Sequence, residues 1–343
     1  MPLRQLFVNV ALSAAILLIG LVLLEFASRV LLPVSPGTRF IGEDGELVDI
    51  HEFLKPQANS GVRIVQVSAD YRAAATVTAQ GYRSPAAGDD PDVVFIGDSF
   101  TFGQGLTDEE TFASRYCARA QRRCANLGHP GTGTWAHVRI LESFLDRYGW
   151  RPREVKLFML ASTSMVSGND LYDTVNDMGM PEIAGEALAA QQANDRALRQ
   201  PRGPVAWMVA QRATILAHSN LARILYQQFG AQIRAALSPQ ATSDNLSIGV
   251  AAVARELHQL DEFAIRRGFA LSIYVLYPMQ DLLRGSHVTA LATVRQAAGD
   301  LRLVDTAPVL IDDPHRYYFP YDGHLNPAGA ERIAALLAAD AGR

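Results

Sequence analysis

Residues 93–103 read VVFIGDSFTFG, and no other stretch says as much about the fold. Its first four residues are apolar, which is typical of a fully buried strand. Gly97 ends the run, and Ser99 follows two residues later. A side chain just after the C-terminal end of a buried parallel strand lies where open α/β sheets bind their ligands. We therefore expect Ser99 to stand at the functional edge of a sheet.

An acid and a base lie far along the chain, in residues 322–327, DGHLNP. Asp322 and His324 are two residues apart, and outside a helix this spacing lets both side chains face one way. A serine hydroxyl is a poor nucleophile until a base removes its proton, and an acid orients that base. Ser99, His324 and Asp322 are therefore the candidate nucleophile, base and acid of a catalytic triad.

Four short blocks occur in the same order as in a known enzyme family. They are residues 97–100 (GDSF), 126–131 (NLGHPG), 168–170 (GND) and 322–324 (DGH). With these blocks the chain resembles the SGNH hydrolases, also called the GDSL esterase/lipase family, although Phe100 stands where most members have leucine. The resemblance covers residues 93–339. It implies a flavodoxin-like three-layer sandwich and an acyl-serine intermediate, with no metal and no organic cofactor.

The resemblance also implies an oxyanion hole, formed by the backbone N–H groups of Ser99 and Gly131 and the side-chain amide of Asn169. Many family members carry the acid three residues before the histidine, where this chain has Tyr321. Asp322 is then the nearest acid, a spacing found in some polysaccharide-modifying relatives. His129 lies inside the second block; a surface loop is the favoured position for it, and the alternative is that it faces the pocket.

Apolar runs alternate with helical patterns after residue 90, which predicts an α/β fold with a central parallel sheet of about five strands. The expected strands are residues 93–96, 124–127, 155–160, 271–276 and 301–304. Helical patterns cover residues 136–147 and 250–267, and a last helix begins at residue 327, with Asn326 as its N-cap. Residues 171–245 break the rhythm and are interpreted as a helical insertion. It either caps the active site or packs without a catalytic role.

The N-terminal residues 6–24 are apolar enough to form a transmembrane helix. The alternatives are a cleaved signal peptide, for which no good cleavage site follows, and a buried core helix. The predicted domains are a cytoplasmic tip (1–5), the anchor (6–24), a juxtamembrane segment (25–90) with short strands at 62–67 and 75–78, and the SGNH-like domain (91–343). The positive-inside rule favours an external catalytic domain.

Cys117 and Cys124 are the only cysteines, seven residues apart. They are either a disulfide across a helix–strand turn or two buried thiols, and two cysteines alone are not a zinc site. The net charge of −4 gives no reason to expect nucleic-acid binding. Residues 131–136 match G-x-G-x-x-A, but no acid follows the next strand, which argues against a dinucleotide site.

These features predict a serine esterase or deacylase acting on an acylated envelope carbohydrate or lipid. The predicted location is the inner (cytoplasmic) membrane, with a single pass and the catalytic domain facing the periplasm or the cell exterior. One alternative is an O-acyltransferase that modifies an exported polysaccharide, and another is a non-catalytic carbohydrate-binding module. The acyl group, the acceptor and the oligomeric state stay open.

Overall fold

The computed structural model describes residues 3–31, 38–50, 54, 61–84, 90–161, 215, 218–225 and 239–340. The chain divides into two compact units. One contains residues 1–37 and 196–237, and the other contains residues 38–195 and 238–343.

The larger unit is built on a parallel sheet whose strand order is β6-β5-β7-β8-β9. In chain order this is 2-1-3-4-5, the flavodoxin-like order, so the predicted five-stranded fold is confirmed. The strands are β5 (Val93–Gly97), β6 (Cys124–Gly128), β7 (Glu154–Leu160), β8 (Ala270–Leu276) and β9 (Leu303–Asp305). The switch point of this topology lies at the carboxyl ends of β5 and β7, where ligands of such sheets bind.

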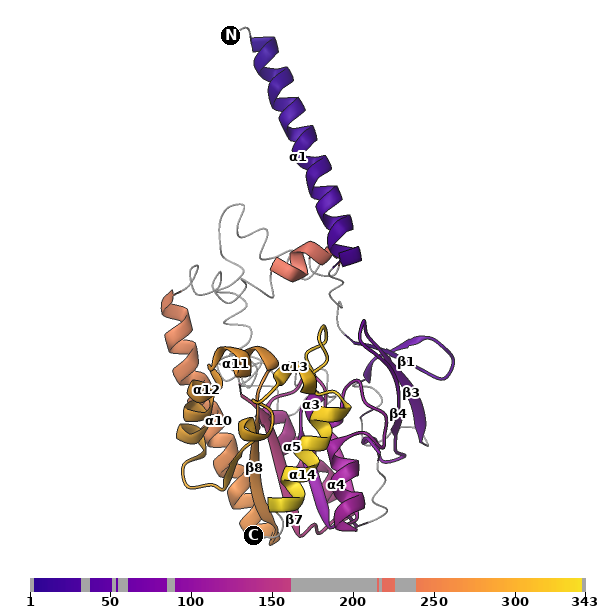
Figure 1. Cartoon of the computed structure of the whole chain (residues 1–343). Coiled ribbons are helices and arrows are strands. Elements are labelled where there is room, and N and C mark those ends of the chain that lie inside the picture. The colour runs from indigo at the N-terminus through magenta and orange to yellow at the C-terminus, as the bar shows by residue number, and fades with distance from the viewer. Residues whose placement is uncertain are drawn as a thin grey trace. The chain divides into compact units, whose positions relative to one another are not determined.

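Helices cover both faces of this sheet (Figure 1). Helices α4 (Phe112–Ala120) and α14 (Pro327–Asp340) pack together, as do α5 (Thr134–Tyr148) and α10 (Pro239–Arg267). The remaining helical segments are α3 (Ser99–Phe102), α11 (Met279–Arg284), α12 (His287–Ala298), η3 (Ala307–Val309) and α13 (Pro314–Tyr317). Asn326 caps α14 as expected, because its Oδ1 accepts the backbone N–H groups of Ala328 and Gly329 at 2.9 and 3.1 Å.

The core lies between the sheet and its helices. Every residue of β5 and β6 is buried, as the continuous apolar run of β5 requires. The Phe158 ring stacks on Tyr274 with ring centroids 4.9 Å apart. Cys117 in α4 and Cys124 at the start of β6 form a disulfide with their Cα atoms 6.1 Å apart. Of the two alternatives that the sequence left open, the structure therefore has the disulfide.

A second, antiparallel sheet precedes the parallel one, with strand order β2-β1-β3-β4. Its strands are β1 (Arg39–Ile41), β2 (Leu47–Val48), β3 (Val62–Val67) and β4 (Arg72–Val77). The sequence pattern placed these residues in a juxtamembrane segment with two short strands. In the structure they belong to the same compact unit as the parallel sheet, which begins at Thr38. Arg83 links the sheets, because it forms bridges with both Val77 and Asn126.

The smaller unit contains the helix α1 (Leu3–Leu31), which includes the whole predicted anchor. Within α1, residues Leu12–Leu31 form one apolar stretch long enough to cross a membrane. The C-terminal end of α1 binds a short helical segment, because the Glu25 carboxylate accepts the backbone N–H groups of Asn220 and Leu221 at 2.8 and 3.1 Å. Most of the predicted insertion, residues 171–245, lies outside the described residues, and its last seven residues belong to α10.

Candidate active site

Ser99 is the first residue of α3, directly beyond the carboxyl end of β5. Two glycines allow α3 to approach the sheet. A Cβ on Gly97 would lie 2.8 Å from the carbonyl oxygen of Phe158, and one on Gly128 would lie 2.1 Å from the backbone nitrogen of Phe102. Asp98 caps the helix, because its Oδ1 accepts the backbone N–H of Phe100 at 2.9 Å. The sequence GDSF thus makes a tight strand-to-helix turn that leaves Ser99 half-buried.

The three predicted triad residues come together. His324 Nε2 lies 2.7 Å from Ser99 Oγ, and His324 Nδ1 bonds Asp322 Oδ1. Gly323 between the acid and the base has a φ of +83°, a left-handed conformation that glycine adopts freely. This conformation lets the side chains at positions 322 and 324 meet although they are only two residues apart. The Phe100 ring packs on the imidazole with centroids 4.6 Å apart.

The electrostatics of the triad favour an ionised acid. Burial by itself would raise the pKa of Asp322, but the hydrogen bond and charge of His324 lower it, as do the hydroxyls of Tyr71 and Thr38. The net effect holds the pKa of Asp322 below its ordinary value. Burial raises the pKa of Asp98 to about 6, against the opposing effects of the Phe100 N–H and His324. Asp98 serves as the N-cap of α3, because its Oδ1 accepts a backbone N–H there.

The three predicted oxyanion donors are only partly described. The loop that carries Gly131 follows β6 and is attached to the end of β5, because the His129 N–H donates to the Gly97 carbonyl at 2.8 Å. Gly131 itself is exposed and has a φ of +75°. The His129 side chain is buried, which corrects the expectation of a surface position. Asn169 lies outside the described residues.

Sequence reasoning missed the groups that surround the acid. Thr38 Oγ1 donates to Asp322 Oδ2 at 3.0 Å, and the hydroxyl of Tyr71 bonds Thr38. The Asp70 carboxylate accepts the backbone N–H groups of Tyr321 and Asp322 at 2.9 and 2.6 Å. These residues belong to the segment that precedes the parallel sheet, and they are separated from the acid by almost the whole of the larger unit's chain. No local motif points to them.

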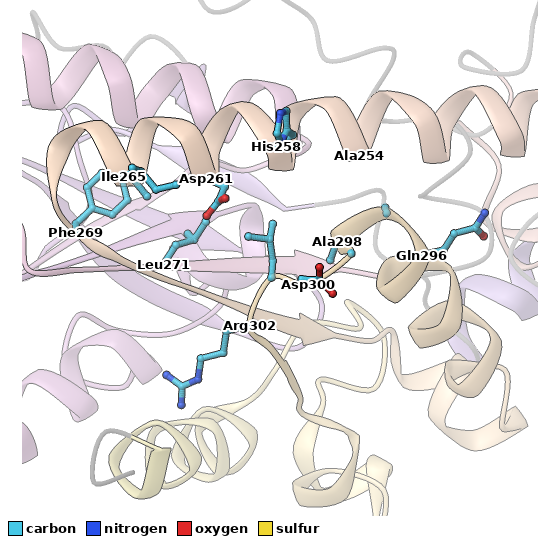
Figure 2. A pocket seen from close by; sticks show the side chains of 14 residues that line it. Ala254, His258, Asp261, Ile265, Phe269, Leu271, Gln296, Ala298, Asp300 and Arg302 are labelled. Carbon is cyan, nitrogen blue, oxygen red and sulfur yellow. The ribbon is translucent and has the colours of Figure 1, made fainter.

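A cavity of about 580 Å³ lies elsewhere in the larger unit (Figure 2). It is bounded by α10, by the C-terminal end of α12 and by the residues that begin β8 and precede β9, including His258, Phe269 and Arg302. Ser99 follows the carboxyl end of its strand, whereas Phe269 and Leu271 lie at the amino end of theirs. The cavity therefore lies at the amino ends of the strands, away from the triad, and takes no part in it. Within the described residues, no group of three or more His, Cys, Asp or Glu side chains could hold a metal ion.

No protein-family model and no curated protein matches the chain. Among solved structures it is similar to a lipolytic protein of the G-D-S-L family from Desulfitobacterium hafniense, with 12% identity, 72% of this chain and 97% of that chain covered, and a TM-score of 0.39. It is also similar to a lipolytic protein of the G-D-S-L family from Veillonella parvula. The identity is 13%, the match covers 72% of this chain and 96% of that chain, and the TM-score is 0.39. A third similar structure is a carbohydrate esterase family 2 enzyme with a carbohydrate binding domain, from Corynascus thermopiles (Myceliophthora fergusii). The identity is 11%, the match covers 90% of this chain and 88% of that chain, and the TM-score is 0.37. Similarities this weak add no argument, so the fold rests on strand order and the site on geometry.

Proposed function

We propose that this protein is a serine esterase or deacylase of the SGNH type, which cleaves an acyl ester through an acyl-serine intermediate. The observation that carries the proposal is the continuous series of hydrogen bonds from Ser99 through His324 to Asp322. A nucleophile, a base within 2.7 Å and an acid that orients the base are the arrangement that acyl transfer by serine needs.

In the proposed mechanism, His324 Nε2 takes the hydroxyl proton as Ser99 Oγ forms a bond to the acyl carbon. Asp322, whose pKa lies below its ordinary value, keeps its charge and stabilises the imidazolium. The imidazolium then gives its proton to the leaving alcohol as the ester bond breaks. A water molecule then attacks the acyl carbon while His324 takes its proton. The bond to Ser99 Oγ breaks, His324 returns the proton to that oxygen, and the carboxylic acid is released. We assign the oxyanion donors to Ser99, Gly131 and Asn169.

The proposed setting is the inner membrane, with a single pass and the catalytic unit in the periplasm or outside the cell. The length and apolar character of α1 support an anchor. The Cys117–Cys124 disulfide supports an oxidising compartment, because cytosolic thiols are normally kept reduced. The proposed substrates are acylated carbohydrates or lipids of the envelope.

The nucleophile is tested by intact-mass analysis after brief exposure to a chromogenic acetyl ester. We expect wild-type protein to carry one additional acetyl group, located on Ser99, and Ser99→Ala to carry none. If wild-type protein neither acquires an acetyl group nor releases the chromophore, the esterase proposal fails. The non-catalytic carbohydrate-binding module then becomes the better interpretation.

The acceptor of the acyl group is tested separately, because hydrolysis and transfer share the acyl-serine and the triad. The purified protein is incubated with an acetyl donor and a set of oligosaccharides, and free acetate is compared with acetylated sugar. We expect mainly free acetate. Mainly acetylated sugar would replace the hydrolase with the O-acyltransferase, since a bound hydroxyl has an effective concentration that bulk water lacks.

A further inference from the structure

The triad acid has partners besides the histidine. Asp322 uses Oδ1 to bond His324 Nδ1, and its other oxygen, Oδ2, accepts a hydrogen bond of 3.0 Å from the hydroxyl of Thr38. Only 4% of the Asp322 side chain is exposed, so water has little access to replace a lost partner. A buried carboxylate that loses a donor is left with a large desolvation cost.

The direction of the hydrogen bonds at Thr38 follows from the chemistry of its partners. A threonine hydroxyl has one hydrogen to donate and two lone pairs to accept with. The ionised Asp322 can only accept, so Thr38 donates its hydrogen to Asp322. Gln104 Nε2 donates to Thr38 Oγ1 at 2.6 Å, and the Tyr71 hydroxyl is hydrogen-bonded to Thr38 and also to Asp322. Gln104 and Tyr71 therefore both contact the Thr38 hydroxyl and restrict its orientation.

The small antiparallel sheet brings these groups to the acid. Thr38 immediately precedes β1, and Tyr71 lies in the turn between β3 and β4. The Tyr71 ring packs against Phe319 on the loop that carries the acid, with centroids 4.8 Å apart. A Cβ on Gly105 would come within 2.6 Å of both rings, so this packing needs glycine there. From the same turn, Asp70 binds the backbone of the acid loop.

We propose that Thr38 is a positioning residue of the triad, which acts through Asp322, and that Tyr71 and Gln104 orient its hydroxyl. The small antiparallel sheet thereby completes the catalytic site. The inference rests on the proposed esterase function, because it concerns how the acid of that triad is held. Without the Thr38 hydrogen bond, the carboxylate is less constrained about its last torsion and orients the imidazole less well.

The test uses the full chain in detergent, a chromogenic acetyl ester and three threonine variants. Thr38→Val keeps the shape but removes the hydroxyl, Thr38→Ser keeps the hydroxyl, and Thr76→Val makes the same change on β4 of the same sheet. Thr38→Val should lower kcat about 10-fold with little change in KM, as expected for a lost hydrogen bond to a charged group. Thr38→Ser should recover most of this loss, and Thr76→Val should match wild type.

The pH profile gives a readout that a structural role would not move. A carboxylate that has lost a donor binds its proton more tightly, so it loses its charge at a higher pH. The acid limb of kcat/KM should therefore move to higher pH in Thr38→Val. The other titratable groups around the acid are Asp70, Tyr71 and Asp98, and of these only Tyr71 loses a hydrogen-bond partner in Thr38→Val.

A double-mutant cycle decides whether Thr38 acts through the acid. In an Asp322→Asn background, Thr38→Val should cause no further loss of kcat. An equal loss in both backgrounds, or no loss in the wild-type background, would overturn the inference. If Thr38→Val does not fold, as judged by its melting curve, Thr38→Ala takes its place with the same expected and contrary outcomes. Ser99→Ala separates the two proposals: if it keeps full activity, the esterase proposal fails, whereas a silent Thr38→Val beside an inactive Ser99→Ala overturns only the role of Thr38.

Discussion

Replacing Asp98 with asparagine should stabilise the protein at neutral pH. The Asp98 side chain is buried at the N-terminus of α3, where Oδ1 accepts the Phe100 N–H at 2.9 Å. Burial raises the pKa of this carboxyl from 3.8 to about 6. The unfolded chain exposes the group and lets it ionise at its ordinary pKa, so folding works against its ionisation.

The magnitude follows from the two pKa values. The difference between 3.8 and about 6 corresponds to roughly 3 kcal/mol at about 1.36 kcal/mol per pKa unit. Well below the unfolded pKa of 3.8 the carboxyl is protonated in both states and the cost is absent, and at about pH 4 only a small part of it is present. As the pH rises toward 6, Asp98 ionises first in the unfolded chain, so the free energy of unfolding falls. Above about pH 6 the whole cost of burying the ionised carboxyl is present. The amide introduced by Asp98→Asn would keep the Oδ1 acceptor and carry no charge, so the gain should grow over this pH range.

Urea and thermal unfolding at neutral pH and at about pH 4 measure this effect. Asp98→Ala removes the cap as well as the charge, so it should gain about 1 kcal/mol less than Asp98→Asn. Asp300→Asn, at an exposed position, should stay within about 0.5 kcal/mol of wild type. Burial of Asp98 carries no such cost if Asp98→Asn is less stable than wild type at neutral pH, or if its gain in unfolding free energy is the same at both pH values.

Three further outcomes are expected. Ser99→Ala and His324→Ala should fold normally and lower esterase turnover by roughly 10⁴-fold, measured as chromophore release, and a variant with near wild-type turnover would remove that residue from the triad. Arg83→Met should lower the free energy of unfolding in urea by about 3–5 kcal/mol. The buried guanidinium bonds Asp108 and three backbone carbonyls, and the variant leaves all four acceptors without it. A decrease below about 1 kcal/mol would contradict this. Thiol labelling of freshly isolated, unfolded protein should find no free thiol at Cys117 or Cys124, and closing so short a loop should contribute about 2 kcal/mol, lost in the double serine variant.

Local patterns were enough to predict the parallel sheet and the position of Ser99. Residues 93–97 are buried on both faces, and a continuous apolar run that ends in glycine carries this information within a few residues. The pairing of Asp322 with His324 could also be predicted, because two side chains separated by one glycine can meet without help from the rest of the fold. The Asn326 cap is local for the same reason, since it depends only on the first turn of α14.

What holds the acid became visible only in the folded chain. β1 and β2 contain three and two residues, too few for a period to be recognised, and their pairing depends on contacts across the sheet. Thr38 reaches Asp322 only because that sheet packs beside the acid loop, a contact between residues 284 positions apart. The disulfide is similar, because the spacing of Cys117 and Cys124 allows either state and only the place where α4 ends beside β6 brings their Cα atoms to 6.1 Å. Sequence therefore specifies the candidate triad residues, because each lies in a short motif, whereas the residues that contact the acid come from distant segments that no short pattern connects.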